Sequence, residues 1–573
     1  MPGPAPGPVE CHPRSGAYLH VPLYHIVGAM LENKSVGPAW PLACTDANAI
    51  FEHAGVYHVM HQTPERAHPP QHGLKDYRAA WGHVVSRDLV RWRRLPDALS
   101  PPAKGKHSYD SHDGDCDGWV SLPSESGLPT PLMTFGPDCA RGLGSNDAPR
   151  VGLAWPKNAS DPYLTEWVKD AANPVSFGKS RPCSFTGSVW RNGRSSSGAS
   201  GANTTYSMIC AVNSLKNAWG RYETHDPKLH GPWTLVDPSF TTWHGPGGAT
   251  RSSLGSISAP SFVQLQPGAT AGAAATPTHM INALGGRAFW LGRYDRSSQS
   301  LDVSGEMSFV ESTDSPANWF VAGRAESDGR VLHVGFVAPT TPTSLADCYN
   351  WVPGGRVCPV TSIRELRLDA TGQALVAMPV KEYATLRNRS LCSLKNVALK
   401  AGEARALPLP DGTGGEMDLE ILMRLPPPAA TGPSPALAFG IDVLASPSSA
   451  AASHATRLSV NVTAPRADGT RIGNLSITPG RGEGKGYVVR SGWVMQPAES
   501  SLELRLLVDR SVVEAFVAGG RAVATARDYP AVEEVAARLW AAGAASESGA
   551  AGGALVQSAQ AWSMGCGWEA PDE

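Results

Sequence analysis

The stretch WPLACTDANAIFEHAGVYHVMHQ (residues 40–62) contains the strand pattern that recurs along most of the chain. Two short apolar segments, Ile50-Phe51 and residues 56–60, flank a His-Ala-Gly turn, and this order predicts strand, turn, strand. One carboxylate, Asp46, stands in a turn of small residues just before the first segment. Because Asp often caps such turns with its own side chain, a structural role and a chemical role are both open for Asp46.

Similar blocks fill the first two thirds of the sequence. Four-stranded units that repeat in this way predict a β-propeller over residues 17–378. Two low-complexity inserts, 193–205 and 267–277, are expected to be solvated loops on that scaffold, and the Pro/Gly-rich residues 1–16 are expected to be disordered. The clearest strand segments are 56–61, 81–86, 131–135, 206–212, 288–293 and 330–336.

The pattern changes after residue 378. Residues 379–394 are expected to form a linker, and residues 395–573 contain alternating strands interrupted by Pro, Ala and Ser loops. Such a pattern is typical of a β-sandwich. The predicted fold class is therefore all-β. The strands expected in the second domain are 417–423, 438–443, 457–462, 502–508 and a final one at 556–562.

The composition supports a β-rich chain and excludes two classes of partner. Among 573 residues there are 60 Gly and 49 Pro, while helical spacing of apolar residues is scarce. Lys plus Arg (49) nearly balance Asp plus Glu (51), so neither nucleic acid nor an anionic membrane is expected as a partner. No apolar run approaches the roughly 18 residues of a membrane-spanning helix.

Cysteine usage and possible glycosylation sites bear on the compartment. Ten cysteines are too few for a disulfide scaffold in a chain of this length, and Cys348 and Cys358 either pair or remain thiols. The N-terminus lacks the basic end and apolar stretch of a signal peptide. Asn-x-Ser/Thr sites nevertheless favour a secreted or vacuolar location, with chance occurrence as the alternative. They are at Asn33, Asn158, Asn203, Asn388, Asn461 and Asn474.

Several blocks, in order along the chain, resemble glycoside hydrolase family 32, the invertase and fructan-hydrolase family. The most specific are WGHVVSRDLVRWRRLPDALSP (81–101), LAWPKNASDPYLTEWVKDAANPV (153–175) and LRLLVDRSVVEAFVAGGRAVATARDYP (504–530). The resemblance implies a five-bladed β-propeller with an axial funnel, followed by a β-sandwich. It also implies retaining transfer of a β-fructofuranosyl group, a small sugar or oligosaccharide as ligand, and no cofactor.

A retaining glycosidase needs a carboxylate nucleophile and a protonated carboxyl acid roughly 5–5.5 Å apart. The family takes its groups from three motifs: Asn-Asp-Pro-Asn-Gly, Arg-Asp-Pro and Glu-Cys. The first motif resembles Thr45-Asp46-Ala47-Asn48-Ala49. Asp46 therefore falls on the nucleophile position, and Asn48 matches the motif's second Asn, which is expected to contact the substrate.

The other two motifs have lost their carboxylates. The Arg-Asp-Pro position falls on Ser184-Phe185-Thr186, and no Asp or Glu occurs between Asp170 and Glu223, although Arg181 retains a cation nearby. The acid/base Glu position falls on Ser258, in a stretch without Asp or Glu from Pro238 to Tyr294. A serine hydroxyl is too weak an acid to protonate a leaving alcohol near neutral pH.

Other side chains match or lie near positions that line the sugar pocket in the family. Gln62, Tyr77 and Trp81 are of types that suit sugars, although Trp81 equally suits core packing. Asp117 closes the acidic run 110–117 and either projects into the funnel, where it would partly replace a lost carboxylate, or belongs to a solvated turn. The run opens like a calcium loop, but Ser124 stands at its twelfth position, so no metal site is expected.

Two functions follow. The first is an active β-fructofuranosidase-type enzyme that uses Asp46 and an unidentified acid. The second is a catalytically silent sugar-binding or regulatory protein on the same scaffold. A carboxylate other than Asp46 at the funnel floor would favour the first, since two carboxyl groups are required.

Overall fold

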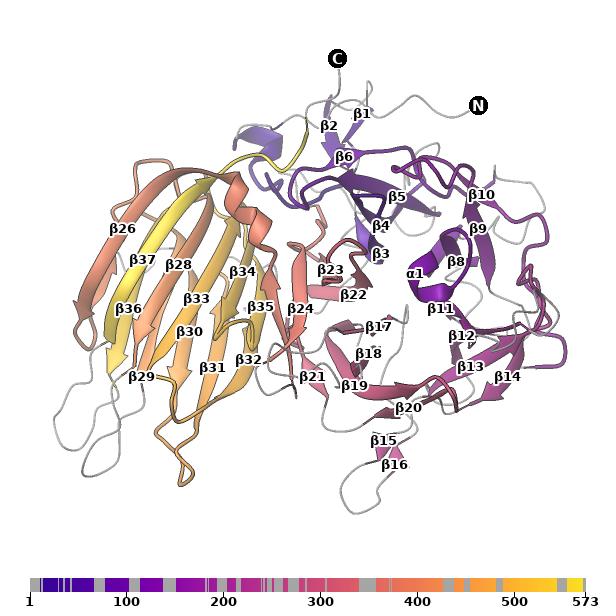
Figure 1. Ribbon diagram of the computed structural model, residues 1–573. Coiled ribbons are helices and arrows are strands. Elements are labelled where there is room, and N and C mark those ends of the chain that lie inside the picture. Colours follow the sequence, from indigo (N-terminus) through magenta and orange to yellow (C-terminus); the bar gives the residue numbers. More distant parts are fainter. Residues whose placement is uncertain are drawn as a thin grey trace.

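The structure is a computed structural model of the 573-residue chain (Figure 1), and all that follows concerns the residues that it describes. These are residues 11, 14–28, 30–33, 37–41, 44–65, 78–102, 114–137, 151–180, 183, 185–192, 204–212, 218–238, 240, 243–244, 250–251, 261–265, 278–283, 286–303, 307–339, 357–369, 372, 374–425, 437–447, 454–480, 488–543 and 554–569.

Five sheets, antiparallel except where β15 pairs with β20, form the blades of a propeller and are arranged in a ring (Figure 1). The first blade contains β3 (Thr45–His53), β4 (Val56–Pro64), β5 (Ala79–Ser86) and β6 (Arg93–Arg94). The second contains β7 (Asp115–Ser121), β8 (Leu132–Pro137), β9 (Gly152–Pro156) and β10 (Trp167–Lys169). The third contains β11 (Phe185–Asn192), β12 (Thr205–Val212), β13 (Ala218–Thr224) and β14 (Thr234–Asp237).

The remaining blades complete the ring. The fourth contains β17 (Phe262–Gln264), β18 (Thr278–Ala283), β19 (Ala288–Asp295) and β20 (Ser300–Val303), with the short strands β15 (Trp243–His244), β16 (Thr250–Arg251) and β21 (Ser308–Phe309) attached. The fifth contains β22 (Ala317–Arg324), β23 (Val331–Val337), β24 (Arg364–Leu368) and β25 (Leu375–Pro379). The one α-helix of the described residues, α1 (Pro123–Ser126), follows β7. A hairpin of β1 (Met30–Asn33) and β2 (Gly37–Pro41) and the 3-10 turn η1 (Gly16–Tyr18) precede the first blade.

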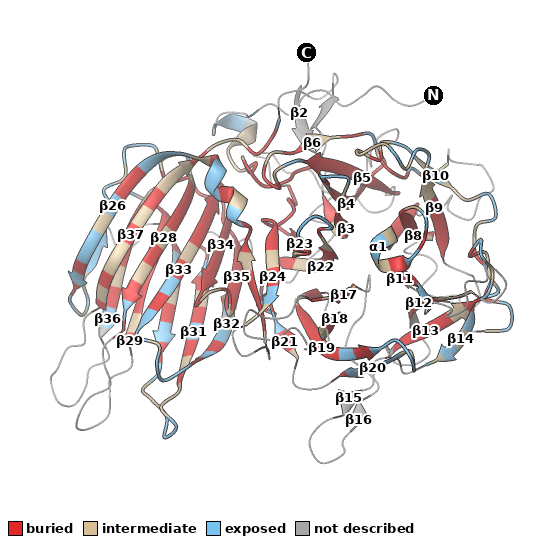
Figure 2. Ribbon diagram, in the orientation of Figure 1, coloured by how far each residue is buried: buried red, intermediate tan, exposed pale blue. Residues whose placement is uncertain are grey.

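The first strand of each blade is the innermost. Strand β3 contacts both β7 and β22, so the fifth blade packs directly against the first. Gly323 permits this closure, because a Cβ atom at that position would lie 1.7 Å from the carbonyl oxygen of Ile50. Strands that are covered on both faces lose the polar alternation of a surface sheet, and every residue of β5 and β7 is buried (Figure 2). Polar side chains in these strands therefore need partners inside the protein.

The C-terminal domain is a sandwich of two six-stranded sheets. One sheet contains β26 (Arg387–Leu399), β37 (Ala554–Met564), β28 (Glu416–Arg424), β33 (Ser501–Asp509), β34 (Val512–Val517) and β35 (Ala522–Arg527). The other contains β27 (Ala404–Ala406), β36 (Ala536–Gly543), β29 (Leu437–Ala445), β30 (Thr456–Val462), β31 (Arg471–Thr478) and β32 (Val489–Met495). Their inward aliphatic side chains form one continuous core.

These strands confirm the predicted all-β class with five blades and a sandwich. Each strand segment expected from the sequence coincides with an observed strand to within a few residues. Within the expected linker 379–394, the 3-10 turn η7 (Lys381–Leu386) is followed at Arg387 by the first sandwich strand. The insert 267–277 and all but the last two residues of the insert 193–205 lie outside the described residues. Among described residues, no helix has the length and apolarity needed to span a bilayer.

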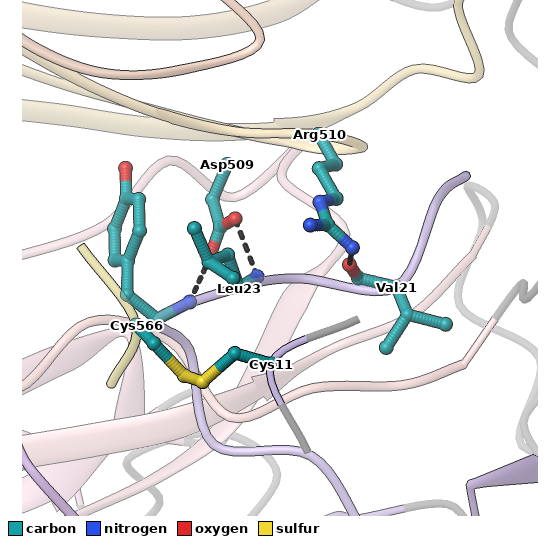
Figure 3. Close-up of a disulfide and its surroundings, with 7 residues drawn as sticks. Cys11, Val21, Leu23, Asp509, Arg510 and Cys566 are labelled. Carbon is teal, nitrogen blue, oxygen red and sulfur yellow. Dashed lines mark hydrogen bonds between the residues drawn. A yellow bond between two sulfur atoms is a disulfide. The ribbon is translucent and has the colours of Figure 1, made fainter. Parts of the chain in front are cut away.

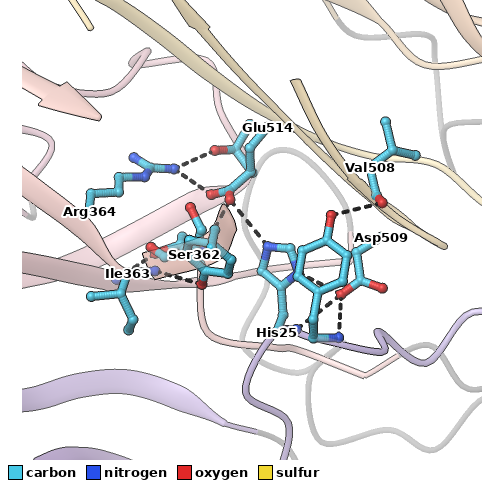
Figure 4. A network of polar contacts seen from close by, with 12 residues as sticks. His25, Ser362, Ile363, Arg364, Val508, Asp509 and Glu514 are labelled. Atoms are coloured by element: carbon cyan, nitrogen blue, oxygen red, sulfur yellow. Dashed lines mark hydrogen bonds and ion pairs between the residues drawn. The ribbon is translucent and has the colours of Figure 1, made fainter. Parts of the chain in front are cut away.

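A buried ionic network joins the two domains (Figure 4). Arg364 of the fifth blade donates to Glu311 (2.8 Å) and to Glu514 of the sandwich (2.6 Å), and all three side chains have no exposed surface. His25 donates from Nδ1 to Asp509 (2.7 Å) and from Nε2 to Glu514 (3.2 Å). Although burial opposes its charge, hydrogen bonds to these carboxylates raise the pKa of His25 to about 9. The cations Arg364 and His25 hold the pKa of Glu514 at about 2, against the effect of burial.

The segment before the first blade is fastened to the C-terminal domain (Figure 3). The backbone N–H groups of Leu23 and Tyr24 donate to Asp509 at 2.6 and 2.9 Å, and Arg510 donates to the carbonyl of Val21 at 3.0 Å. A disulfide joins Cys11 to Cys566. Of the N-terminal residues 1–16, residues 1–10, 12 and 13 lie outside the described part of the chain.

Other cysteines are also oxidised. Cys183 and Cys210 form a disulfide that joins the start of the third blade to β12. Cys116 and Cys358 each take part in a disulfide as well. The possible partner of Cys358, Cys348, lies outside the described residues.

We expect loss of the Cys11–Cys566 bond to destabilise the protein. The bond spans 555 residues of sequence, and closing a long loop removes conformational entropy from the unfolded chain. Replacing Cys566 by Ser should lower the free energy of unfolding by about 2–4 kcal/mol. Urea unfolding under non-reducing conditions measures this difference, and an unchanged transition would show that the bond does not constrain the unfolded chain.

Candidate active site

Two carboxylates stand near the starts of neighbouring innermost strands. Asp46 is the second residue of β3, and Asp117 is the third residue of β7. In each case the pairing register with the next strand shifts at this point, between Thr45 and Ala47 and between Cys116 and Gly118. Such β-bulges leave one residue unpaired and redirect its side chain. The same local irregularity therefore sets both carboxylates apart from the regular pleat of their strands.

Gln62 brings these carboxylates together. Its Nε2 atom donates to Asp46 Oδ2 at 3.3 Å and also to Asp117 Oδ1. Two acceptors of one nitrogen are no more than two hydrogen-bond lengths, about 6 Å, apart. That spacing is compatible with the roughly 5–5.5 Å between the carboxyl groups of retaining glycosidases.

Burial raises the pKa values of both carboxyl groups. Removal from water raises the pKa of Asp46 well above its ordinary value, and the negative charge of Asp117 raises it further. Burial also raises the pKa of Asp117 to about 6, although the hydrogen bond from Gln62 partly opposes the shift. Asp46 Oδ1 is buried and accepts no hydrogen bond from the described residues. Two close carboxylates cannot both ionise easily, so the pair holds its last proton to a higher pH than an isolated carboxyl group does.

Asn48 and Trp81 are buried next to the carboxylate pair and form hydrogen bonds with the backbone around it. Both are completely buried. In the orientation that satisfies its amide, Asn48 donates to the backbone carbonyl of Asp46 (3.2 Å) and accepts from Trp81 Nε1 (3.1 Å). The same indole N–H approaches the carbonyl of Cys116 at 2.9 Å, which places Trp81 between β3 and β7. Trp81 was expected to bind substrate or pack in the core; it packs in the core, where it has no surface for a sugar.

Gly118 fixes the path of the second bulge. A Cβ atom there would lie 1.9 Å from the carbonyl oxygen of Thr134, so any larger residue would push β7 away from β8. Asp117, one residue earlier, is 8% exposed. The alternative that Asp117 belongs to a solvated acidic turn is therefore wrong.

The neighbouring Asp115 has its own counterion. Lys169 on β10 contacts both oxygens of Asp115, at 2.8 and 2.7 Å, and Asp115 is completely buried. This ion pair accounts for the Asp115 carboxylate without a metal. The described residues contain no group of three or more His, Cys, Asp or Glu side chains arranged to hold a metal ion.

Three of the predicted site residues, Tyr77, Arg181 and Ser258, lie outside the described residues. The nearby Ser261 is described: its hydroxyl accepts from the backbone N–H of Ala322 at 3.0 Å, which joins the fourth blade to the fifth. Asp46, Asn48, Gln62, Trp81 and Asp117 are thus the predicted residues that the structure brings together, three of them at the carboxylate pair and two behind it.

Comparison with known proteins agrees with this geometry. The model "Glycosyl hydrolases family 32 N-terminal domain" matches residues 43–182, and "Glycosyl hydrolases family 32 C terminal" matches residues 382–563. The chain belongs to glycosyl hydrolase family 32.

Relatives within family 32 resemble the chain over most of its length. An insoluble β-fructofuranosidase, CWINV6 of Arabidopsis thaliana, is 26% identical over 91% of the chain and 92% of its own length. A fructan 6-exohydrolase of Triticum aestivum is 24% identical over 85% and 82%. The crystal structure of fructan 1-exohydrolase IIa from Cichorium intybus superposes with a TM-score of 0.68 and 20% identity over 95% of the chain and 98% of its own.

The family 32 pattern in the sequence led to Asp46, but the part played by Gln62 depended on the fold. Gln62 and Asp117 are 55 positions apart in sequence, and they meet only because adjacent blades pack side by side. Two weak features of the sequence could have indicated the bulges: the small residues around Asp46 and the glycine that follows Asp117.

Proposed function

We propose that this chain hydrolyses or transfers β-fructofuranosyl groups by a retaining mechanism, with Asp46 as nucleophile and Asp117 as proton donor. The observation that carries this proposal is the contact of Gln62 Nε2 with both carboxylates. Through this contact, Asp117 provides a second carboxyl group beside Asp46, although Ser258 stands at the position of the family's acid/base Glu. The names of the relatives, β-fructofuranosidase and fructan exohydrolase, support sucrose or a fructan as substrate.

The pair can perform both steps of the reaction. In the first, Asp46 attacks the anomeric carbon of the fructosyl unit while Asp117 protonates the glycosidic oxygen, and the alcohol leaves. In the second, Asp117 takes a proton from water, or from an acceptor alcohol, whose oxygen displaces Asp46 from the ester. Gln62 keeps both carboxylates in place during this exchange, and one shared proton is what the first step requires.

A silent sugar-binding protein is the second candidate. The observation that favours it is the loss of the family's other two carboxylates, at Ser184-Phe185-Thr186 and at Ser258. A single electrostatic or acid/base group commonly contributes about 10²- to 10⁴-fold to a rate. With Asp117 as the single substitute among the described residues, the site would bind a fructosyl sugar and turn it over slowly or not at all.

Incubation of the purified protein with sucrose and with inulin separates these candidates. We expect release of fructose by the wild-type chain and none by the Asp46→Ala variant. The exposed Asp302 on the fourth blade provides a control, because Asp302→Ala removes a carboxylate far from the pair. Thermal stabilisation by sucrose without any turnover would contradict the enzymatic proposal and support the silent protein.

The disulfides bear on where the protein acts. Disulfide bonds persist mainly in oxidising compartments, and four described Asn-x-Ser/Thr asparagines, Asn158, Asn388, Asn461 and Asn474, are exposed. We therefore infer that the protein is exposed to the secretory pathway. Mass spectrometry of the protein from its native source should detect glycans on these asparagines.

A further inference from the structure

A pocket lies at the ends of the innermost strands that are farther from Asp46. Its walls come from the far ends of the innermost strands: Ser121 of β7, Arg191 of β11, Gln264 of β17 and Arg324 of β22. Four residues of extended chain, about 13 Å, separate Asp117 from Ser121 along β7. The enclosed part of the pocket has a volume of about 100 Å³, and its mouth is open to solvent.

One wall of this pocket is aromatic and rigid. Trp190, Phe262 and Tyr294 pack against one another with ring centroids 5.3–5.9 Å apart. The indole N–H of Trp190 donates to the Tyr294 hydroxyl (3.0 Å), and that hydroxyl donates to Gln299 (2.6 Å). Because the polar atoms of Trp190 and Tyr294 are already paired, the wall offers a ligand mainly apolar surface.

The pocket is also lined by polar groups that have unused hydrogen-bonding capacity. Ser188 is 7% exposed, and its hydroxyl has no hydrogen-bond partner among the described residues. Glu125 and Arg324 both line the pocket. The positive charge of Arg324 lowers the pKa of Glu125, yet burial dominates and raises that pKa to about 7. These two side chains, both described, make no direct hydrogen bond or ion pair with each other, so both are available to a ligand.

Glu125 is held in position by the α1 turn. The turn begins at Pro123 and ends at Gly127, which adopts the left-handed conformation with φ of 68°. The hydroxyl of Ser126 donates to the carbonyl of Leu122 at 2.7 Å, which closes the turn. In Figure 1, α1 lies on the inner side of the ring of blades, between β3 and β11. The carboxylate is thus presented by a fixed turn of the blade scaffold.

We propose that this pocket is a second binding site, distinct from the carboxylate pair, for a neutral sugar unit. A sugar hydroxyl both donates and accepts, so it can pair with a guanidinium, a carboxylate and a serine at once. An aromatic wall suits the C–H face of a sugar ring. An ionised Glu125 offsets the charge of Arg324 in the inner part of the pocket, which favours a neutral ligand there, whereas Arg191 and Arg296 are exposed at the rim, where solvent and salt screen their charges.

Calorimetric titration of the full chain tests this site. The probes are D-glucose, D-galactose and D-fructose, with D-glucose 6-phosphate as the anionic comparison. We expect at least one neutral sugar to bind, and Glu125→Gln and Arg324→Gln each to weaken that binding about tenfold or more, since each removes a hydrogen bond to a charged group. The Arg293→Gln variant is the matched control, because Arg293 is exposed on the fourth blade and does not line the pocket.

The Asp46→Asn variant separates this site from the funnel. Binding that persists in Asp46→Asn but is lost in Glu125→Gln supports the second site. The proposal is overturned if no neutral sugar binds, if only D-glucose 6-phosphate binds, or if Asp46→Asn removes the binding while Glu125→Gln and Arg324→Gln retain it. Unchanged melting temperatures of the two pocket variants show that any loss is local.

Discussion

The Asp117→Asn variant should hydrolyse sucrose with a kcat/KM about 10²- to 10⁴-fold below that of the wild type. Asparagine keeps the size of the side chain and the contact with Gln62, but it has no proton to give to the leaving oxygen. The loss should be much smaller for 4-nitrophenyl β-D-fructofuranoside, whose phenolate leaves without protonation. Asp46→Asn should lose both activities, because the ester to the fructosyl unit can no longer form.

The pH dependence provides an independent check on the pair. Activity requires one protonated and one ionised carboxyl group. Burial raises the pKa of Asp117 to about 6 and raises that of Asp46 well above its ordinary value. Because Asp117 is the proton donor, raising the pH through about 6 ionises it, and activity on sucrose should fall. An Asp117→Asn variant with equal losses on both substrates, or with the alkaline limb of the wild type intact, would remove Asp117 from the mechanism.

Replacing Arg364 by Met should destabilise the protein by about 3–5 kcal/mol, the cost of removing one partner from a buried ion pair. The change leaves Glu311 and Glu514 buried without their shared cation. Because these carboxylates belong to different domains, we expect the two domains to lose part of their mutual stabilisation. Equilibrium urea unfolding, followed by tryptophan fluorescence, measures the change.

Arg367→Met is the matched control for this prediction. Arg367 lies on the same strand, β24, but is exposed, so its replacement should change the free energy of unfolding by less than about 0.5 kcal/mol. Adding Glu311→Gln to Arg364→Met should recover part of the loss, since Glu311 loses the cation that it pairs with, whereas Glu514 keeps its contact with His25. Equal stability of the Arg364→Met and Arg367→Met variants would mean that the network contributes little to folding.

The fold was accessible from the sequence because short apolar segments and turns are local properties. The strands β4, β5 and β28, for example, were predicted almost to their ends. The number of blades came from the family resemblance instead, since the blades differ in length and the inserts hide their period. The ring itself depends on contacts such as Gly323 against Ile50, which join residues far apart in sequence.

The candidate site was predicted only in part. Asp46 was recognised from its motif, whereas Asp117 stood in a polar run that looks solvated by composition. Its burial depends on Gln62 and on the ion pair between Asp115 and Lys169, which are 54 positions apart. Likewise, Trp81 has the residue type of a sugar-binding wall, and only its packing between β3 and β7 assigns it to the core. Local sequence does not report such partners.

The bond between Cys11 and Cys566 makes the polypeptide a covalent ring of nearly its whole length. It can close only when the last sandwich strand, β37, has been synthesised, because Cys566 follows that strand directly. A mechanical load applied at the two cysteines would pass through the sulfur atoms, and neither the blades nor the sandwich would unravel from an end. In the native protein the two domains therefore share one loop of chain, and a single proteolytic cut between them would leave both pieces attached.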